Sequence, residues 1–131
     1  MTGLAHFLTI AEASSLIERH DLSPVTLTEA FLKRIEYLNP KLNAYVTVTG
    51  ERALDDARAA EQEIANGDYK GPLHGIPIAL KDIYDTAGIR TTSQSHLHIN
   101  RTPTRDSQTA ALLRAAGTVM LGKLTTHEFA F

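Results

Sequence analysis

The sequence contains no cysteine among its 131 residues. Disulfide bonds, thiolate nucleophiles and cysteine-ligated zinc sites are therefore excluded. Long hydrophobic runs are missing too, since none approaches the ~18 consecutive apolar residues of a membrane-spanning helix. Residues 1–6 show no basic stretch leading into an apolar one, so no signal peptide is expected. These absences predict a cytoplasmic protein without a membrane partner.

An excess of one charge is also lacking. The chain has 13 Lys and Arg against 15 Asp and Glu, a formal net charge of -2. Nucleic-acid-binding surfaces carry a strong positive excess, so nucleic acid is not expected as a partner. The remaining composition, 43% hydrophobic and 21% charged, is that of a globular chain with a single core.

Capping signals and apolar spacing predict helices and strands in an α/β order. Thr9 followed by Glu12 is a capping-box pattern, and Ser23-Pro24 marks a second helix start, which Asn39-Pro40 is expected to end. The other expected elements are a strand over 44–48, a helix over 51–66 ended by Gly67, a strand within 70–82, mostly loop over 85–105, a helix from Asp106 or Ser107 to Gly117, and a strand over 118–121. This order predicts a sheet covered by helices.

Lys81 is the foremost candidate for chemistry. It follows Ile76–Leu80, a run apolar at consecutive positions, as in a strand buried on both faces. Burial at the end of such a strand would favour the neutral amine, the form that acts as a general base. The alternative from the same residues is that Lys81 extends into solvent or pairs with Asp82 at the surface.

Five short sequence words stand in a distinctive order along the chain. Gly71–Asp82 reads G-P-L-x-G-(I/V)-P-x-x-x-K-D and resembles the segment of amidase signature enzymes that carries their catalytic lysine. The other matching words are T-x-G-x-x-T-T at 86–92, D-x-x-x-V-x-x-L-R-x-A-G at 106–117, G-K-T-N-x-x-E-F-A at 122–130, and the approach to the first strand at 34–44. Leu124 and Thr125 depart from the usual Thr and Asn of the last word.

The resemblance implies a fold and a reaction. The fold would be a mixed, mostly parallel sheet covered by helices, the amidase signature fold. The reaction would be hydrolysis of an amide, ester or carbamate bond in a small-molecule substrate through an acyl-serine intermediate. Lys81 would relay protons through a bridging serine, and the resemblance implies neither a metal nor an organic cofactor.

The family's two serines lie in a glycine-serine segment, G-G-S-S-G-G-S, whereas no two of the eight glycines here are adjacent. The chain is therefore expected to be the amino-terminal part of a single amidase domain, with a helical lead-in over 1–70 and the start of the catalytic sheet over 71–131. It would supply the lysine but not the serines, and would be inactive alone. Its expected partners are the remainder of the domain or a complementing chain, and self-association is also expected. The alternative is a non-catalytic truncated or split-gene fragment with a binding or assembly role.

Other polar residues near the lysine motif are given structural interpretations. Ser93 and Ser95 are interpreted as loop residues that bond nearby backbone, because a nucleophile needs a base within reach and an anion hole. Lys123 is interpreted as solvated or ion-paired. Asp82 is interpreted as a support for the strand end, or else as a turn residue.

The histidines are candidate ligands of a metal site. His96 and His98 have the i, i+2 spacing that places two side chains on one face of a strand. Two histidines do not complete a tetrahedral metal site, and His74 and His127 are distant in sequence. Polar loop histidines are therefore predicted, with no metal site.

Overall fold

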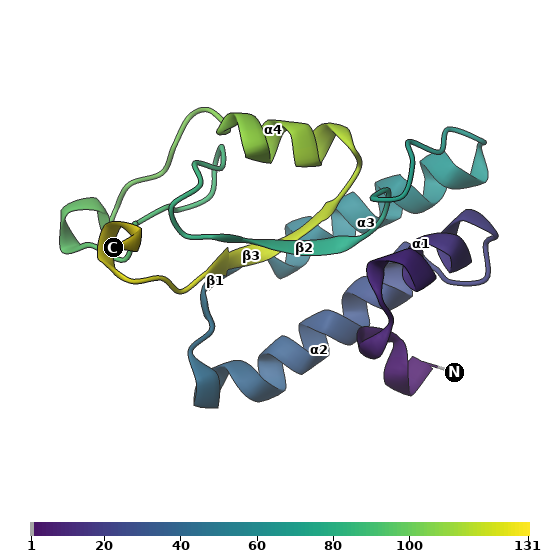
Figure 1. The fold of residues 1–131 in the computed structure, drawn as a ribbon, viewed down its shortest axis with the longest axis horizontal. Coiled ribbons are helices and arrows are strands. Elements are labelled where there is room, and N and C mark those ends of the chain that lie inside the picture. The colour runs from purple at the N-terminus through teal and green to yellow at the C-terminus, as the bar shows by residue number, and fades with distance from the viewer. Residues whose placement is uncertain (1) are drawn as a thin grey trace.

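The computed structural model describes residues 2–131, with side chains described from Ala5 onward. It contains the α-helices α1 (Ile10–Glu18), α2 (Pro24–Leu42), α3 (Gly50–Ala65) and α4 (Gln108–Ala115), the strands β1 (Tyr45–Val48), β2 (Pro77–Lys81) and β3 (Val119–Leu124), and 3-10 turns at Thr2–Phe7, His96–His98 and Glu128–Ala130. In Figure 1 the strands run between α4 above and α2 below.

The first two helices begin at the predicted caps. The Thr9 hydroxyl accepts a hydrogen bond from the backbone N–H of Glu12, and the Glu12 carboxylate accepts one from the backbone N–H of Thr9 at 2.8 Å. Before α2, the Ser23 hydroxyl accepts from Val25 N, and Pro24 occupies the first helical position. Each cap satisfies backbone N–H groups that have no partner within the helix. Both predicted starts are confirmed.

The predicted end of α2 at Asn39-Pro40 is wrong, because the helix continues through Pro40 to Leu42. Proline inside a helix gives up one backbone hydrogen bond, and tertiary contacts can outweigh that loss. The Asn39 side chain stabilises this last turn locally: it accepts from Tyr45 N at 2.8 Å and donates to Tyr45 O at 3.2 Å. The helix ends instead at Asn43, which is left-handed with φ 49° and donates its N–H to Asn39 O.

Helix α3 ends at the glycine that the sequence predicts. Gly67 has φ +85° and donates its N–H to Ile64 O, while Asp68 donates to Glu63 O. These two bonds form the Schellman pattern, which closes a helix on a left-handed residue. The prediction of Gly67 as the C′ residue is confirmed.

The three strands form one mixed sheet in the order β1-β3-β2. Strand β2 is parallel to β3, and β1 is antiparallel to β3. The fold is therefore α/β, as predicted. The apolar run before Lys81 is less buried than expected: strand β2 starts only at Pro77, and Leu80 is its single fully buried residue. The reason is that β2 pairs on one side only among the described residues.

Two apolar clusters hold the helices to the sheet. In the first, Ala53 and Ala57 of α3 meet Val119 and Leu121 of β3. The small alanine side chains bring α3 close to the strand, and burial of apolar surface stabilises the fold by about 25 cal/mol per Å². The second cluster joins α1, α2 and the residue before β2 and includes Ile17, Leu27 and Ile76.

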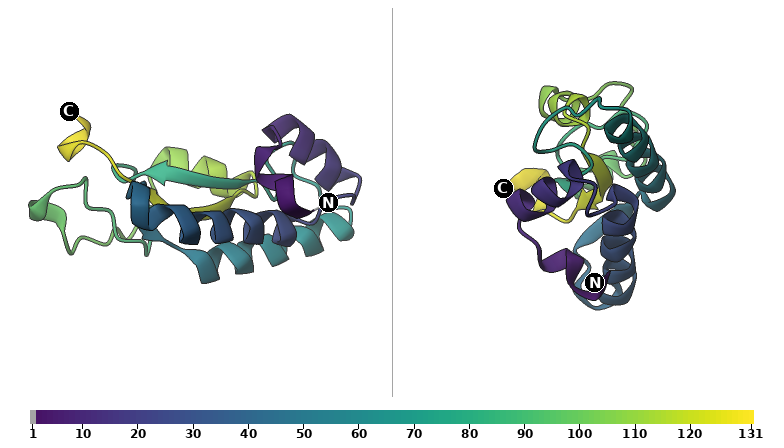
Figure 2. Two further views of the ribbon diagram at one scale, coloured as in Figure 1. Left: turned by 90° about the horizontal axis from the view of Figure 1, so that it is seen from below. Right: turned by 90° about the vertical axis from the view of Figure 1, so that its right-hand side faces the viewer.

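The helices lie lengthwise against the sheet. The left view of Figure 2 shows α2 and α3 running side by side along the strands. Across residues 2–131, no helix has the length and apolar character to cross a bilayer.

Candidate active site

Polar residues gather where β2 and β3 end. Because the two strands are parallel, Lys81 and Asp82 come to the same edge of the sheet as Lys123. In Figure 1 both strand arrows point toward the end of the molecule that carries the C-terminus. The carboxyl edge of parallel strands is where α/β proteins place their ligands.

The Lys123 side chain is completely buried. Its Nζ donates to Tyr84 O at 2.6 Å and to Thr91 Oγ1 at 2.7 Å, and it lies 3.7 Å from Asp82 Oδ1. Burial lowers the pKa of the Lys123 ammonium, while the Asp82 charge opposes that shift. Of the two interpretations, solvated or ion-paired, the structure supports the ion pair.

Asp82 joins this pair to the loop that follows the strand. Its Oδ2 accepts from Thr92 N at 3.0 Å and from Thr92 Oγ1 at 2.5 Å, and its backbone O accepts from Ser93 N at 2.8 Å. Its Oδ1 has no hydrogen-bond donor among the described residues and faces only the Lys123 ammonium. These contacts agree with the supporting role expected for Asp82 at the strand end.

Lys81 differs from Lys123 in its surroundings. It is half-buried, and its backbone O accepts from Tyr84 N at 3.1 Å. Within residues 5–131, where side chains are described, its Nζ makes no hydrogen bond and no ion pair. Of the two alternatives, therefore, pairing with Asp82 is not what the structure shows, since Asp82 is turned to Lys123.

The serines near the motif have structural roles. Ser95 Oγ accepts from Leu97 N at 3.3 Å and caps the turn His96–His98. Ser93 is held through its backbone, which donates to Asp82 O and accepts from Phe129 N at 2.9 Å. Neither hydroxyl is hydrogen-bonded to a lysine in the described part of the chain, in line with the expected loop role.

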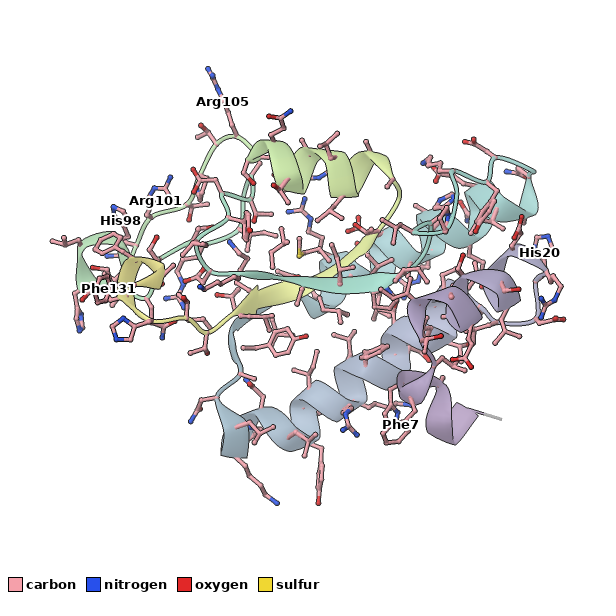
Figure 3. The ribbon with its side chains drawn as sticks, in the orientation of Figure 1. Phe7, His20, His98, Arg101, Arg105 and Phe131 are labelled. Atoms are coloured by element: carbon pink, nitrogen blue, oxygen red, sulfur yellow. The ribbon has the colours of Figure 1, made fainter. Side chains whose placement is uncertain are left out.

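A second ion pair closes the loop beyond Asp82. Arg101 donates to both oxygens of Asp85, at 2.7 and 2.6 Å. These bonds hold the pKa of the Asp85 carboxyl below its ordinary value of 3.8. Figure 3 shows Arg101 and His98 at the same end of the molecule as Phe131, with His20 at the other end. The pair was not anticipated from sequence, because its partners lie 16 residues apart in a region without periodicity.

The histidines do not form a metal site in the part of the chain with described side chains. His96 and His98 lie on a 3-10 turn in the loop after β2, so their i, i+2 spacing is not that of a strand, and the prediction of loop histidines holds. His98 packs edge-on against Phe129, with ring centroids 5.5 Å apart. No group of three or more His, Cys, Asp or Glu residues within the described residues could hold a metal ion.

His74 is a buried residue whose role sequence reasoning missed. Its Nδ1 accepts from Lys70 N at 3.1 Å, so in the neutral ring Nε2 carries the proton and donates to Glu63 at 2.9 Å. The imidazole thereby ties the end of α3 to the turn before β2, at the opposite end of the strand from Lys81. The sequence held one signal for this contact: His74 lies between Gly71 and Gly75, and a glycine-bounded turn can bring a side chain back onto the end of the preceding helix.

The sequence profile of the Amidase family matches residues 26–131. The chain belongs to this family. It is 51% identical over 123 residues to a glutamyl-tRNA(Gln) amidotransferase subunit from Geobacter metallireducens, and 47% identical over 125 residues to the corresponding subunit from Methylococcus capsulatus. The first alignment covers 94% of this chain and 25% of the relative, and the second covers 95% and 26%.

Solved structures agree with this assignment. The chain superposes on native peptide amidase from Stenotrophomonas maltophilia with a TM-score of 0.89 and 32% identity, covering 98% of this chain and 26% of that one. The chain therefore spans about a quarter of the length of the proteins it matches. Its fold is that of the corresponding quarter of an amidase.

Proposed function

We propose that this chain is part of an amidase signature enzyme that cleaves an amide bond by a Ser-Ser-Lys mechanism, with Lys81 as the catalytic lysine. Membership of the Amidase family supports the carbon–nitrogen hydrolase class. The position of Lys81 at the carboxyl end of β2, within Gly71–Asp82, supports its role.

A difference between the two strand-end lysines carries this proposal. A lysine that transfers protons needs an amine whose lone pair can be reached by the reacting group. The Lys123 amine already donates to two oxygens and faces a carboxylate. The Lys81 amine has no such partner among residues 5–131, so it is the one that can serve a serine.

The reaction proceeds by acyl transfer. The Lys81 amine takes a proton, through the bridging serine, from the nucleophilic serine. The serine Oγ then forms a bond to the amide carbon. Collapse of the tetrahedral intermediate breaks the C–N bond, and the proton leaves with the amine or ammonia. Water then attacks the acyl-serine, and its collapse releases the carboxylic acid and restores the serine hydroxyl. No step requires a metal or an organic cofactor.

The remainder of the amidase domain, or a complementing chain, supplies both serines in this proposal. The relatives are named as subunits of a glutamyl-tRNA(Gln) amidotransferase, which supports a multi-subunit enzyme and an amide as the nitrogen donor. Hydrolysis and amide transfer share the same first half-reaction, so Lys81 has the same role in both.

The test uses the protein with the remainder of the domain present in the same polypeptide or as a second chain. A fluorophosphonate probe should label a serine, and ammonia should be released from simple primary amides. Lys81→Met keeps most of the apolar side chain, and should slow both by about a hundred- to ten-thousand-fold. Lys33→Met, at an exposed lysine on α2, is the matched control and should change neither. Near wild-type rates in Lys81→Met would exclude the lysine mechanism, and an unlabelled wild type would favour the non-catalytic alternative.

A further inference from the structure

The strand register separates the two lysines. Lys81 lies beside Leu124, and Lys123 lies beside Leu80. Paired residues of neighbouring strands point to the same face, and successive residues point to opposite faces. Lys81 and Lys123 are therefore on opposite faces of the same strand ends, and Asp82 faces Lys123.

The charges behind Lys81 are balanced. Lys123 and Asp82 are both fully buried and lie 3.7 Å apart. The other charged groups that face Lys123 are Asp85 and Arg101, from the loop after β2, and these two pair with one another. The region thus holds two positive and two negative charges, and removing any one leaves an uncompensated charge.

The contacts of the pair are made to the backbone and side chains of one loop. Lys123 bonds Tyr84 O and Thr91 Oγ1, and Asp82 bonds Thr92 and Ser93. The Lys123 ammonium is thereby directed at residues 82–92, which begin directly after Lys81. A connected network of this kind holds a backbone segment in one arrangement.

We propose that the buried Lys123–Asp82 pair is a positioning element for Lys81: it clamps the loop 82–95 behind the strand end and keeps the charge next to the catalytic amine at zero. The proposal rests on the catalytic role of Lys81 described above. It assigns Lys123 and Asp82 no contact with substrate.

The Lys123–Asp82 pair predicts in which direction each variant shifts the pH dependence of the fluorophosphonate labelling rate. Proton transfer to Lys81 needs its neutral form, so the labelling rate rises with pH along an acid limb. Lys123→Met leaves the Asp82 carboxylate alone, which favours the Lys81 ammonium and moves that limb to higher pH. The expected shift is about 0.5–1 pH unit, the order of the interaction between two unit charges not in contact at an effective dielectric constant of roughly 20–40. The double variant Asp82→Asn/Lys123→Met removes both charges and should return the limb to the wild-type pH.

The experiment measures the rate of fluorophosphonate labelling against pH in the protein with the complete amidase domain. The proposal is supported if the acid limb of the pH–rate profile moves to higher pH in Lys123→Met and returns to the wild-type pH in the double variant. An unshifted limb in Lys123→Met, or a shift that the double variant retains, overturns it. A purely structural role would lower the rate at every pH without this reversal.

Variants of Thr92 keep the test decisive if Lys123→Met fails to fold. Thr92→Val removes the hydroxyl that donates to Asp82 and leaves all charges in place. The maximal labelling rate should fall about tenfold, with no shift of the limb, because a loosened strand end misplaces the amine. Thr92→Ser restores the hydroxyl and should restore the rate. Equal, wild-type rates in both variants would overturn the clamp.

Failure of the two proposals can be told apart. If wild type is labelled and Lys81→Met is not, the catalytic role stands, whatever Lys123→Met does. If Lys81→Met is labelled as fast as wild type, the catalytic role is wrong and the positioning role fails with it.

Discussion

Gly122 of β3 lies against the backbone of Thr47 in β1 so closely that a Cβ atom on it would come within 2.1 Å of the Thr47 carbonyl oxygen. The same glycine has φ +150°, and the register of β3 against β2 shifts just before it, between the partners Met120 and Gly122. One extra residue in a strand forms a bulge, which turns the following side chains. This bulge directly precedes Lys123 and sets the direction in which its buried side chain points.

Replacing Gly122 by Ala is expected to destabilise the protein strongly. The added methyl group meets backbone, which cannot move without breaking the pairing of β1 with β3, so a loss of about 3 kcal/mol or more is expected. The measurement is chemical unfolding of the protein with the complete domain. Gly88→Ala is the control: its φ is +73° but its Cβ would meet nothing within 4 Å, so it should cost only about 1 kcal/mol. Similar losses in both variants would contradict the close-approach argument.

The Asp85–Arg101 pair predicts a dependence of stability on acid. The folded-state pKa of Asp85 is lowered, chiefly by the hydrogen bonds from Arg101, so its contribution is present above the ordinary value of 3.8 and is lost as pH falls through the folded-state pKa. Both side chains are more than a third exposed, so Asp85→Asn should lower the free energy of unfolding by only about 0.5–1 kcal/mol at neutral pH.

Urea unfolding between pH 7 and pH 3 measures this effect. The difference between Asp85→Asn and wild type should shrink as pH falls below about 4. Asp55→Asn breaks the more exposed pair with Arg58 and should change stability by no more than a few tenths of a kcal/mol. A difference for Asp85→Asn that stays constant down to pH 3 would contradict the assigned cause.

The polypeptide of these 131 residues alone is expected to show no amidase turnover. Ser93 and Ser95 are engaged in the loop, and neither is hydrogen-bonded to a lysine among the described residues. Mass spectrometry after fluorophosphonate treatment should find no modified serine. Stoichiometric labelling of Ser93 or Ser95, lost on substitution by Ala, would show that the nucleophile lies within this segment.

The same polypeptide is expected to self-associate or to be partly molten in isolation. Strands β1 and β2 each have one partner within the described residues, and unpaired strand edges recruit other chains. Large apolar side chains are exposed as well, among them Phe7 at 67% and Leu97 at 83%. Gel filtration with light scattering and near-ultraviolet dichroism of the four tyrosines would test this. A monodisperse monomer with a cooperative melt would show that the segment folds autonomously.

The sequence by itself determined the local features of this protein. The caps at Thr9 and Ser23 and the stop at Gly67 were predictable, because each depends on hydrogen bonds between residues at most five positions apart. The α/β order and the family were predictable as well, since periodicity and motif words are properties of the chain alone.

Only the tertiary structure decided which of the strand-end lysines is fully buried and which has an amine without a hydrogen-bond partner among residues 5–131. Lys123 meets Thr91 and Tyr84 across 32 and 39 residues, and the bulge before it lies in the pairing of β3 with β2, a strand distant in sequence. The run of α2 through Pro40 was missed for a different reason: the Asn39 bonds to Tyr45 span only six residues, but they oppose the usual effect of proline on the residue before it. Local rules weigh only neighbouring residues, whereas burial, charge pairing and close backbone approach arise when distant segments come together.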